Sequence, residues 1–150
     1  MKKKQKYIED VKESLGFMLW QASTKWRRQI EEALSPLDLT HTQFILLASL
    51  NHLSYEGHNA SQVDLARHAN LDVTMTSQIL RTLEQKGFIE RRMQTGDERS
   101  KFPHLTRLGT QLIEQAMAVV EEIDSSFFDH LKSDTKKCRD ILQKLHIYES

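Results

Sequence analysis

The segment from Ser61 to Thr106 constrains this chain most, because its pattern changes from two short helices to an alternating, basic hairpin. Ser61 is followed three positions later by Asp64, the spacing of a capping box that satisfies amide groups at a helix N-terminus. Asn70 marks a break after the first helix, and Asp72 can cap a second one. The sequence therefore predicts two helices joined by a tight turn.

The two predicted helices each carry an apolar face. Val63, Leu65 and Ala66 supply a small one on the first helix. On the second helix, side chains that we expect to face the core recur at i, i+3, i+4 and i+7. Gly87 ends this helix in our interpretation, because glycine readily adopts the left-handed conformation of a helix C-terminus. The predicted inward residues of the second helix are Thr76, Ile79, Leu80 and Leu83.

The opposite face of the second helix is polar, short-chained and nearly free of acids. Hydroxyl, amide and guanidinium groups can hydrogen-bond to base edges or phosphates, whereas carboxylates there would repel the phosphate backbone. We therefore predict that this face enters a DNA major groove. The predicted contacts are Ser61 and Gln62 on the first helix and Thr74, Met75, Ser77, Gln78 and Arg81 on the second.

A hairpin is predicted after Gly87, where the apolar period changes from helical to alternating. We expect a strand at 88–92, a turn at 94–97 and a returning strand at 99–105. From 86 to 107 there are six basic residues against three acidic ones, so the local field is positive. An arginine near the tip could enter a minor groove while its neighbours hold phosphates. The predicted contacts are Arg91, Arg92, Asp97, Arg99 and Lys101.

The chain resembles the MarR (multiple antibiotic resistance regulator) family of bacterial transcription factors. Five segments fall in the family's order and spacing, and together they cover roughly residues 37 to 112. They are Leu39 and Thr40 with Gln43 to Leu47, Asp64 to Ala66, Leu83 to Arg91, Asp97 to Lys101, and Leu105 to Gly109. The resemblance implies that the second helix is the recognition helix, and that Asp97 orients Arg99 toward the minor groove.

Three features depart from the family pattern. Glu98 stands where many relatives have a basic residue, which should weaken phosphate attraction at the hairpin tip. Pro103 cannot donate a ladder hydrogen bond, so we expect its strand to be an edge there or to be bent. A long polar connection is expected at 51–59, before the first helix of the motif.

The flanking segments are predicted to be helices that form a dimer. We expect helices at about 9–33, from Thr106 onward, and after Asp134, with apolar stripes that the winged motif alone cannot cover. A symmetric dimer would bury them and would place two recognition helices about one turn of DNA apart, on a pseudo-palindromic operator. The predicted fold class is mainly α with a small β-hairpin wing (α+β). Residues 1–150 form one chain, with a winged helix-turn-helix at about 37–105 between dimerisation helices at about 7–35 and 106–148.

Composition fits this interpretation once charge is considered by region. The net charge is zero, but the lysines at 2–6 and the hairpin are basic, whereas the C-terminal part is acidic. The lysine run is either a solvated terminus or an arm that touches DNA. The sequence has no apolar run of membrane-spanning length and no apolar signal-peptide core. Its single cysteine, Cys138, agrees with a reducing cytoplasm, which is the expected location.

A binding site for a small-molecule effector is the next candidate site. Family members often bind small phenolic or lipophilic ligands in a cleft between the dimer helices and the winged part. Such a small aromatic or lipophilic effector is expected here, although aromatic residues at helical spacing are more often part of a core. The candidate cleft residues are Phe17, Trp20, Trp26, His41 and Phe44.

Metal binding, catalysis and protein binding are the remaining alternatives. Seven histidines raise a metal hypothesis, but none are spaced i, i+4, and His52, His58 and His68 are only loosely grouped. We expect no metal and no cofactor. We also predict no enzyme, because there is no nucleophile elbow, phosphate-binding glycine loop or metal-hydrolase pair. A winged-helix adaptor or antirepressor is the alternative to a DNA-binding regulator. A repressor is favoured, because steric exclusion of polymerase needs no extra contact surface.

Overall fold

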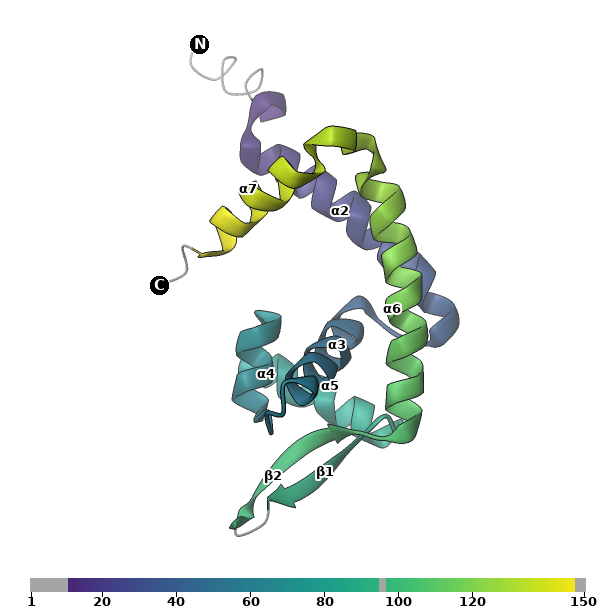
Figure 1. Ribbon diagram of the computed structural model, residues 1–150, viewed down its shortest axis with the longest axis vertical. Helices are drawn as coiled ribbons and strands as arrows, with labels where there is room; N and C mark the ends of the chain where they lie inside the picture. The colour runs from purple at the N-terminus through teal and green to yellow at the C-terminus, as the bar shows by residue number, and fades with distance from the viewer. Residues whose placement is uncertain (1–10, 95–96, 148–150) are drawn as a thin grey trace, which may run out of the picture.

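The computed structural model places a winged part at one end of a long helix, α6 (Arg107–Phe128), and two further helices, α2 and α7, at the other (Figure 1). The structure describes residues 11–94 and 97–147, without the side chains of residues 12, 94, 97–100 and 147. The lysine run at 2–6, which the sequence leaves open as a solvated terminus or a DNA-touching arm, and the side chains of Asp97 and Arg99 therefore lie outside the described residues. None of the described helices is long and apolar enough to cross a membrane.

The N-terminal helix starts later than the predicted residue 9. A short 3₁₀ turn, η1 (Val11–Glu13), precedes α2 (Leu15–Leu34). Ser14 separates them because its backbone is extended, with φ −66° and ψ 127°, and its hydroxyl accepts a hydrogen bond from the amide of Phe17. An N-cap thus overrides the apolar period that suggested a continuous helix.

The winged part begins after a second 3₁₀ turn, η2 (Ser35–Leu37), and Asp38, which adopts a left-handed conformation with φ 53°. Helix α3 (His41–Tyr55) follows, capped by a reciprocal pair of hydrogen bonds between Thr40 and Gln43. It continues through residues predicted to be a polar connection, because Leu50 and Leu53 extend its core-facing side. The actual connection is short, from 56 to 61.

The predicted helix-turn-helix is confirmed as α4 (Gln62–Ala69) and α5 (Val73–Gln85). Ser61 and Asp64 form the predicted capping box, and Asn70 turns the chain with φ 51°. The carboxylate of Asp72 accepts a hydrogen bond from the amide of Met75 at 3.0 Å, which fixes the start of α5. The predicted inward position of Val63 is wrong, because this side chain is 50% exposed while Leu65 and Ala66 are buried.

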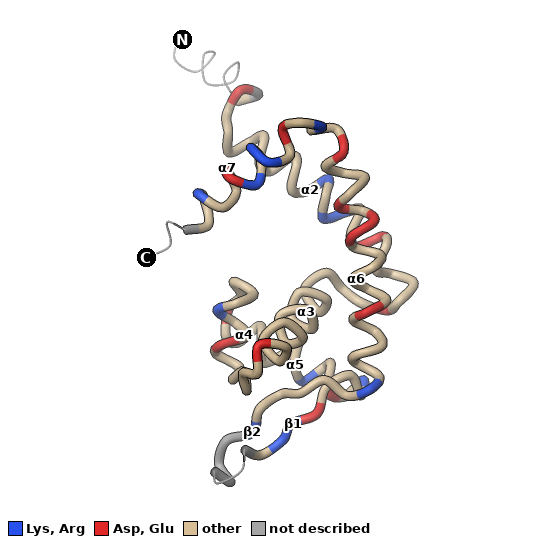
Figure 2. The backbone as a smooth tube through the Cα atoms, viewed as in Figure 1, with Lys and Arg blue, Asp and Glu red and all other residues tan. Residues whose placement is uncertain are grey.

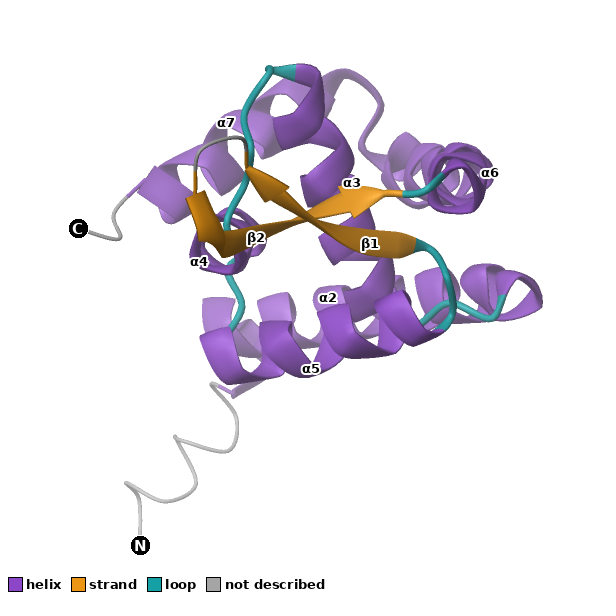
Figure 3. Ribbon diagram, turned by 90° about the horizontal axis from the view of Figure 1, so that it is seen from below, coloured by secondary structure: helices purple, strands orange, loops and turns teal. Residues whose placement is uncertain are grey.

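The predicted hairpin is confirmed as β1 (Ile89–Gln94) paired antiparallel with β2 (Asp97–Leu105). Both strands extend further toward the tip than predicted, and the register is irregular between Met93 and Gln94. Pro103 lies opposite Arg91 in a two-stranded sheet, so it occupies an edge strand as expected. In the view from below, the hairpin and α5 both lie on the side of the molecule nearest the viewer (Figure 3).

The core lies where α3 meets α2, α4, α5 and α6. Its fully buried side chains come from each of these helices, which ties α6 to the winged part. After α6 the chain passes through η3 (Asp129–Asp134), where Lys132 is left-handed with φ 48°, into α7 (Thr135–Ile147). Fully buried aliphatic residues include Ile30, Leu34, Leu46, Leu47, Leu50, Leu65, Leu80, Leu83 and Ile113.

Candidate nucleic-acid interface

Helix α5 presents the polar face that its sequence predicts. Thr76, Leu80 and Leu83 are at most 1% exposed, and Ile79 is half-buried and packs against the core, so the inward stripe is confirmed. The buried hydroxyl of Thr76 donates to the backbone carbonyl of Asp72 at 2.8 Å, which satisfies its hydrogen-bonding need without solvent. The predicted contact residues Thr74, Met75, Gln78 and Arg81 are exposed, and Ser77 is half-buried.

The start of α4 contributes Ser61 and Gln62, both half-buried. The hydroxyl of Ser61 donates to a carboxylate oxygen of Asp64 at 2.7 Å, and the amide of Ser61 donates to the same oxygen at 2.9 Å. These hydrogen bonds from Ser61 hold the pKa of Asp64 below its usual range. The hydroxyl proton of Ser61 is thus already committed, which leaves Gln62 as the more available donor for a phosphate.

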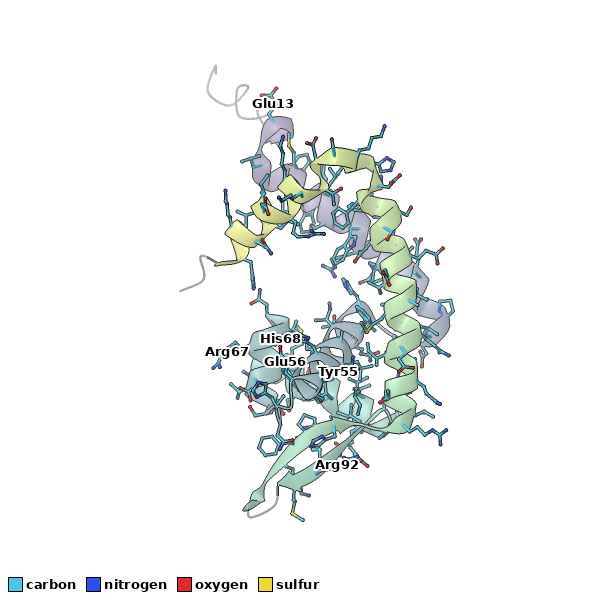
Figure 4. All side chains as sticks on the ribbon, viewed as in Figure 1. Glu13, Tyr55, Glu56, Arg67, His68 and Arg92 are labelled. Carbon is cyan, nitrogen blue, oxygen red and sulfur yellow. The ribbon has the colours of Figure 1, made fainter. Side chains whose placement is uncertain are left out.

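The basic residues near this face differ in their partners. Arg91 Nε lies 3.5 Å from a carboxylate oxygen of Glu84 on α5, and Arg92 Nε donates to Glu90 at 2.6 Å. Arg81 forms no ion pair with any described side chain. Figure 4 shows Arg92 on the hairpin, well away from Arg67 and His68 on α4.

Lys86 fixes the far end of α5. Its ammonium group donates to both the backbone carbonyl and the carboxylate of Asp38, each at 3.2 Å. Gly87 then ends the helix in the left-handed region, with φ 81°, as predicted. Helix α5 is therefore capped by Asp72 at its start, and at its end Lys86 joins it to Asp38 in the turn before α3.

The junction between hairpin and α6 is a site that sequence reasoning missed. The hydroxyl of Thr106 donates to the carbonyl of Gly87 at 2.6 Å, and its amide donates to the carbonyl of Phe88 at 3.1 Å. A Cβ on Gly109 would lie 1.9 Å from that Phe88 oxygen. The Leu105 to Gly109 motif, seen in the sequence only as part of a resemblance, thus lets α6 sit directly on the base of the hairpin.

Three of the five candidate effector residues come together. The rings of Trp26 and His41 meet edge to face at 5.0 Å, and His41 stacks with Phe44 at 6.5 Å. The indole of Trp26 donates to Asp124 on α6 at 2.7 Å. Phe17 and Trp20 take part in none of the described aromatic pairs, and Trp20 is 67% exposed.

His41 is the unusual member of this cluster. It is 9% exposed, and its Nε2 has no hydrogen-bond partner among the described residues. Burial, with a further contribution from the charge of Arg27, lowers the pKa of His41 below its ordinary value of 6.5. The imidazole is thus held neutral at the point where α2, α3 and α6 meet.

Two of the histidines considered for metal binding are close together. The rings of His52 and His68 lie 5.3 Å apart, between α3 and α4, and His52 contacts Glu56 at 3.5 Å. In the described part of the chain, no group of three or more His, Cys, Asp or Glu side chains is arranged to hold a metal ion.

Charge is segregated between α6 and the hairpin. In Figure 2, acidic residues mark α6 along much of its length, whereas basic ones lie on the hairpin and near its base and also on α2 and α7. The predicted acidic C-terminal part therefore holds for α6 but is wrong for α7, which is basic. The acids on α6 and just beyond it are Glu114, Glu121, Glu122, Asp124 and Asp129. A polyanion is therefore drawn to the hairpin rather than to α6.

Comparison with known proteins agrees with this geometry. The model of the MarR family matches residues 39–101. A Bacillus subtilis protein, the uncharacterized HTH-type transcriptional regulator YdcH, is 42% identical over 115 residues, which are 77% of this chain and 78% of YdcH. The chain belongs to the MarR family. The HTH-type transcriptional repressor Rv2887 of Mycobacterium tuberculosis is 31% identical to this MarR-family chain over 132 residues, covering 87% and 92% of the two chains.

Solved structures give the same result. The crystal structure of Rv2887 in complex with salicylic acid has a TM-score of 0.69 and 32% identity, over 88% of this chain and 96% of that one. A mutant of Escherichia coli MarR in complex with operator DNA has a TM-score of 0.74 and 27% identity, over 87% and 91%. The predicted winged helix-turn-helix fold is thereby confirmed.

Proposed function

We propose that this MarR-family chain is a sequence-specific DNA-binding transcription regulator that acts as a homodimeric repressor. The observation that carries the proposal is α5: three inward residues are almost fully buried, while a polar surface that has Glu84 as its only acid faces outward beside a basic hairpin. A helix with one face buried in the core and a polar face exposed fits the major groove, and a hairpin beside it fits the neighbouring minor groove. Action on chromosomal DNA implies a cytoplasmic location.

The contacts divide by role. Base edges are recognised by Thr74, Ser77 and Gln78, with Met75 as an apolar contact, and Arg81 reaches a base or a phosphate. At the start of α4, Gln62 donates to a phosphate of the DNA backbone, and Ser61, whose hydroxyl and amide both donate to Asp64, holds the N-terminus of the helix beside that phosphate. On the hairpin, Asp97 orients Arg99 into the minor groove, while Arg91, Arg92 and Lys101 support phosphate binding directly or through their neighbours.

Homodimerisation is supported by apolar side chains that one chain leaves uncovered. Leu15 and Trp20 on α2 are 84% and 67% exposed, and Leu145 on α7 is 64% exposed. These helices lie at the end of the molecule opposite the hairpin (Figure 1). A second copy would bury these faces and set two recognition helices on one operator. Further exposed apolar residues at this end are Met18, Leu19, Ile141 and Leu142.

A small aromatic or lipophilic effector is proposed to release the DNA. Rv2887 is solved with salicylic acid, and in this chain Trp26, His41 and Phe44 form an aromatic cluster between the dimer helices and the winged part. The unpartnered Nε2 of His41 could accept or donate a hydrogen bond to such a ligand. Phe17 and Trp20 remain candidates on the part of the cleft that a second subunit would complete.

Binding of the purified full chain to the DNA upstream of its own gene tests the proposal. Anisotropy titrations at two salt concentrations, against a scrambled duplex, should show tight, specific and salt-sensitive binding by a dimer. Arg99→Ala should weaken binding to all sequences, whereas changes at Thr74, Ser77 or Gln78 should alter sequence preference. Binding no tighter than to scrambled DNA, both here and to duplexes selected from random sequence, would reject the proposal.

A further inference from the structure

We propose that the Glu84–Arg91 ion pair sets the position of the hairpin relative to the recognition helix, so that Glu84 and Arg91 are positioning residues rather than DNA contacts. This inference rests on the proposed function, since positioning matters only if both elements bind one duplex. Glu84 lies in the last turn of α5, and Arg91 lies in β1. Their side chains are 41% and 28% exposed, and Arg91 Nε is 3.5 Å from the Glu84 carboxylate.

Strand geometry explains why Arg91 faces α5. Successive side chains of a strand point to opposite faces, so Arg91 shares a face with Ile89, which is 2% exposed in the core. Arg92 is on the other face and pairs with Glu90 of the same strand. Arg91 thus continues the buried side of the hairpin outward, to the point where it meets the end of α5.

Among the described residues, the hairpin has few other polar contacts with the helices. At its base, the hydroxyl and the amide of Thr106 donate to the carbonyls of Gly87 and Phe88. Further out, Glu84–Arg91 is the only ion pair among the described residues that joins a strand to a helix. A two-stranded hairpin is weakly stable on its own. An ion pair part-way along the hairpin therefore limits how far the hairpin can move away from α5.

The direction in which one substitution changes DNA affinity separates this role from its alternatives. An acid near a DNA-binding surface repels phosphates, so Glu84→Gln should leave affinity unchanged or increase it if Glu84 were merely a surface residue. If Glu84 positions Arg91, the same substitution should weaken binding. We expect a loss of about two- to fivefold per ion pair, a range set by the modest strength of a partly exposed ion pair.

The experiment uses the full chain and a duplex selected from random-sequence DNA with the wild-type protein. Glu84→Gln, Arg91→Gln and the double variant should weaken binding by similar factors, because each removes the same interaction. The slope of log affinity against log salt should stay at the wild-type value for all three variants. If Arg81 contacts a phosphate, Arg81→Gln should reduce that slope by about one per subunit. Glu121→Gln on α6, about four helical turns beyond the hairpin base, gives the same change in net charge and serves as the matched control.

Hydrogen exchange without DNA tests the positioning separately from DNA recognition. Exchange of the β1 and β2 amides should quicken in Glu84→Gln while that of α2 and α6 stays as in the wild type. Unchanged exchange of the β1 and β2 amides in Glu84→Gln would overturn the inference. So would DNA binding in which Glu84→Gln binds as well as the wild type and only Arg91→Gln lowers the salt slope. If the wild type recovers no preferred duplex, the proposed function fails, and the exchange result still decides whether the pair holds the hairpin.

Discussion

Replacing Gly109 with alanine should disturb the junction between α6 and the hairpin, although it adds only one methyl group. The added Cβ would lie 1.9 Å from the carbonyl oxygen of Phe88 and 2.9 Å from its carbonyl carbon, whereas real Cβ contacts essentially never fall below 3.0 Å. The start of α6 and the base of the hairpin must therefore separate by about 1 Å. Both are backbone, so no side-chain rotation can relieve the overlap.

The energetic cost has three parts. Overpacking a rigid site costs about 1–3 kcal/mol. Separation also weakens the two hydrogen bonds by which Thr106 joins α6 to the hairpin base. Its amide donates to the carbonyl of Phe88 at 3.1 Å and its hydroxyl donates to the carbonyl of Gly87 at 2.6 Å, and each bond is worth about 1 kcal/mol. Alanine recovers up to about 1 kcal/mol as the better helix former. The expected net loss in the free energy of unfolding is about 2–4 kcal/mol.

Chemical and thermal unfolding at one fixed protein concentration measure this loss, because a dimer's stability depends on concentration. A fall in Tm of roughly 5–15 °C is expected for a chain of this size. Gly16→Ala is the matched control, since the nearest atom to its Cβ would be the Ser14 hydroxyl oxygen at 3.8 Å. That variant should be unchanged or more stable by up to about 1 kcal/mol. Equal stability of the two variants would show that α6 does not rest on Phe88.

Three further substitutions test other parts of the structure. Trp26→Phe should lower the free energy of unfolding by about 1–3 kcal/mol in denaturant titrations, because Asp124 loses its hydrogen bond. Asp124→Asn should lower it by less, since the amide oxygen can still accept the hydrogen bond from the indole. The lowered pKa of His41 means that the unfolded chain takes up a proton first, so wild-type stability should fall as pH drops through about 6.5, and His41→Gln should reduce that fall. A pH dependence identical in both proteins would refute the buried neutral imidazole. Asp72→Ala should cost about 1 kcal/mol, and retention of full stability would show that the α5 cap is dispensable.

The parts of the fold that the sequence predicted correctly are those set by local rules. The Ser61–Asp64 capping box, the cap at Asp72 and the turn at Gly87 each depend on residues within four positions of one another. The same local chemistry also explains an error, since Ser14 caps α2 where the apolar period alone suggested an earlier start. A periodic stripe shows which face of a helix is buried, but it does not show where competing side-chain hydrogen bonds end the helix.

The contacts that join elements could not be predicted, because they depend on three-dimensional packing. Gly109 and Phe88 are 21 positions apart, and Trp26 and Asp124 are 98 apart. Nothing in the local pattern distinguishes these residues from a helical glycine or a surface acid. For the same reason, the sequence predicted Arg91 as one of several equivalent cations, and only the structure shows its carboxylate partner on α5.

This difference in partners also bears on how a neutral chain can bind a polyanion. Lys86, Arg91 and Arg92 are paired with acids of the same chain, so they stabilise the winged part more than they attract phosphates. Arg81 and Lys101 form no ion pair with a described side chain, so they remain available to replace counterions on DNA. A count of basic residues therefore overstates the electrostatic part of binding. The salt dependence of operator affinity should follow the smaller set of available cations, and specificity should depend more on the hydroxyl and amide groups of α5.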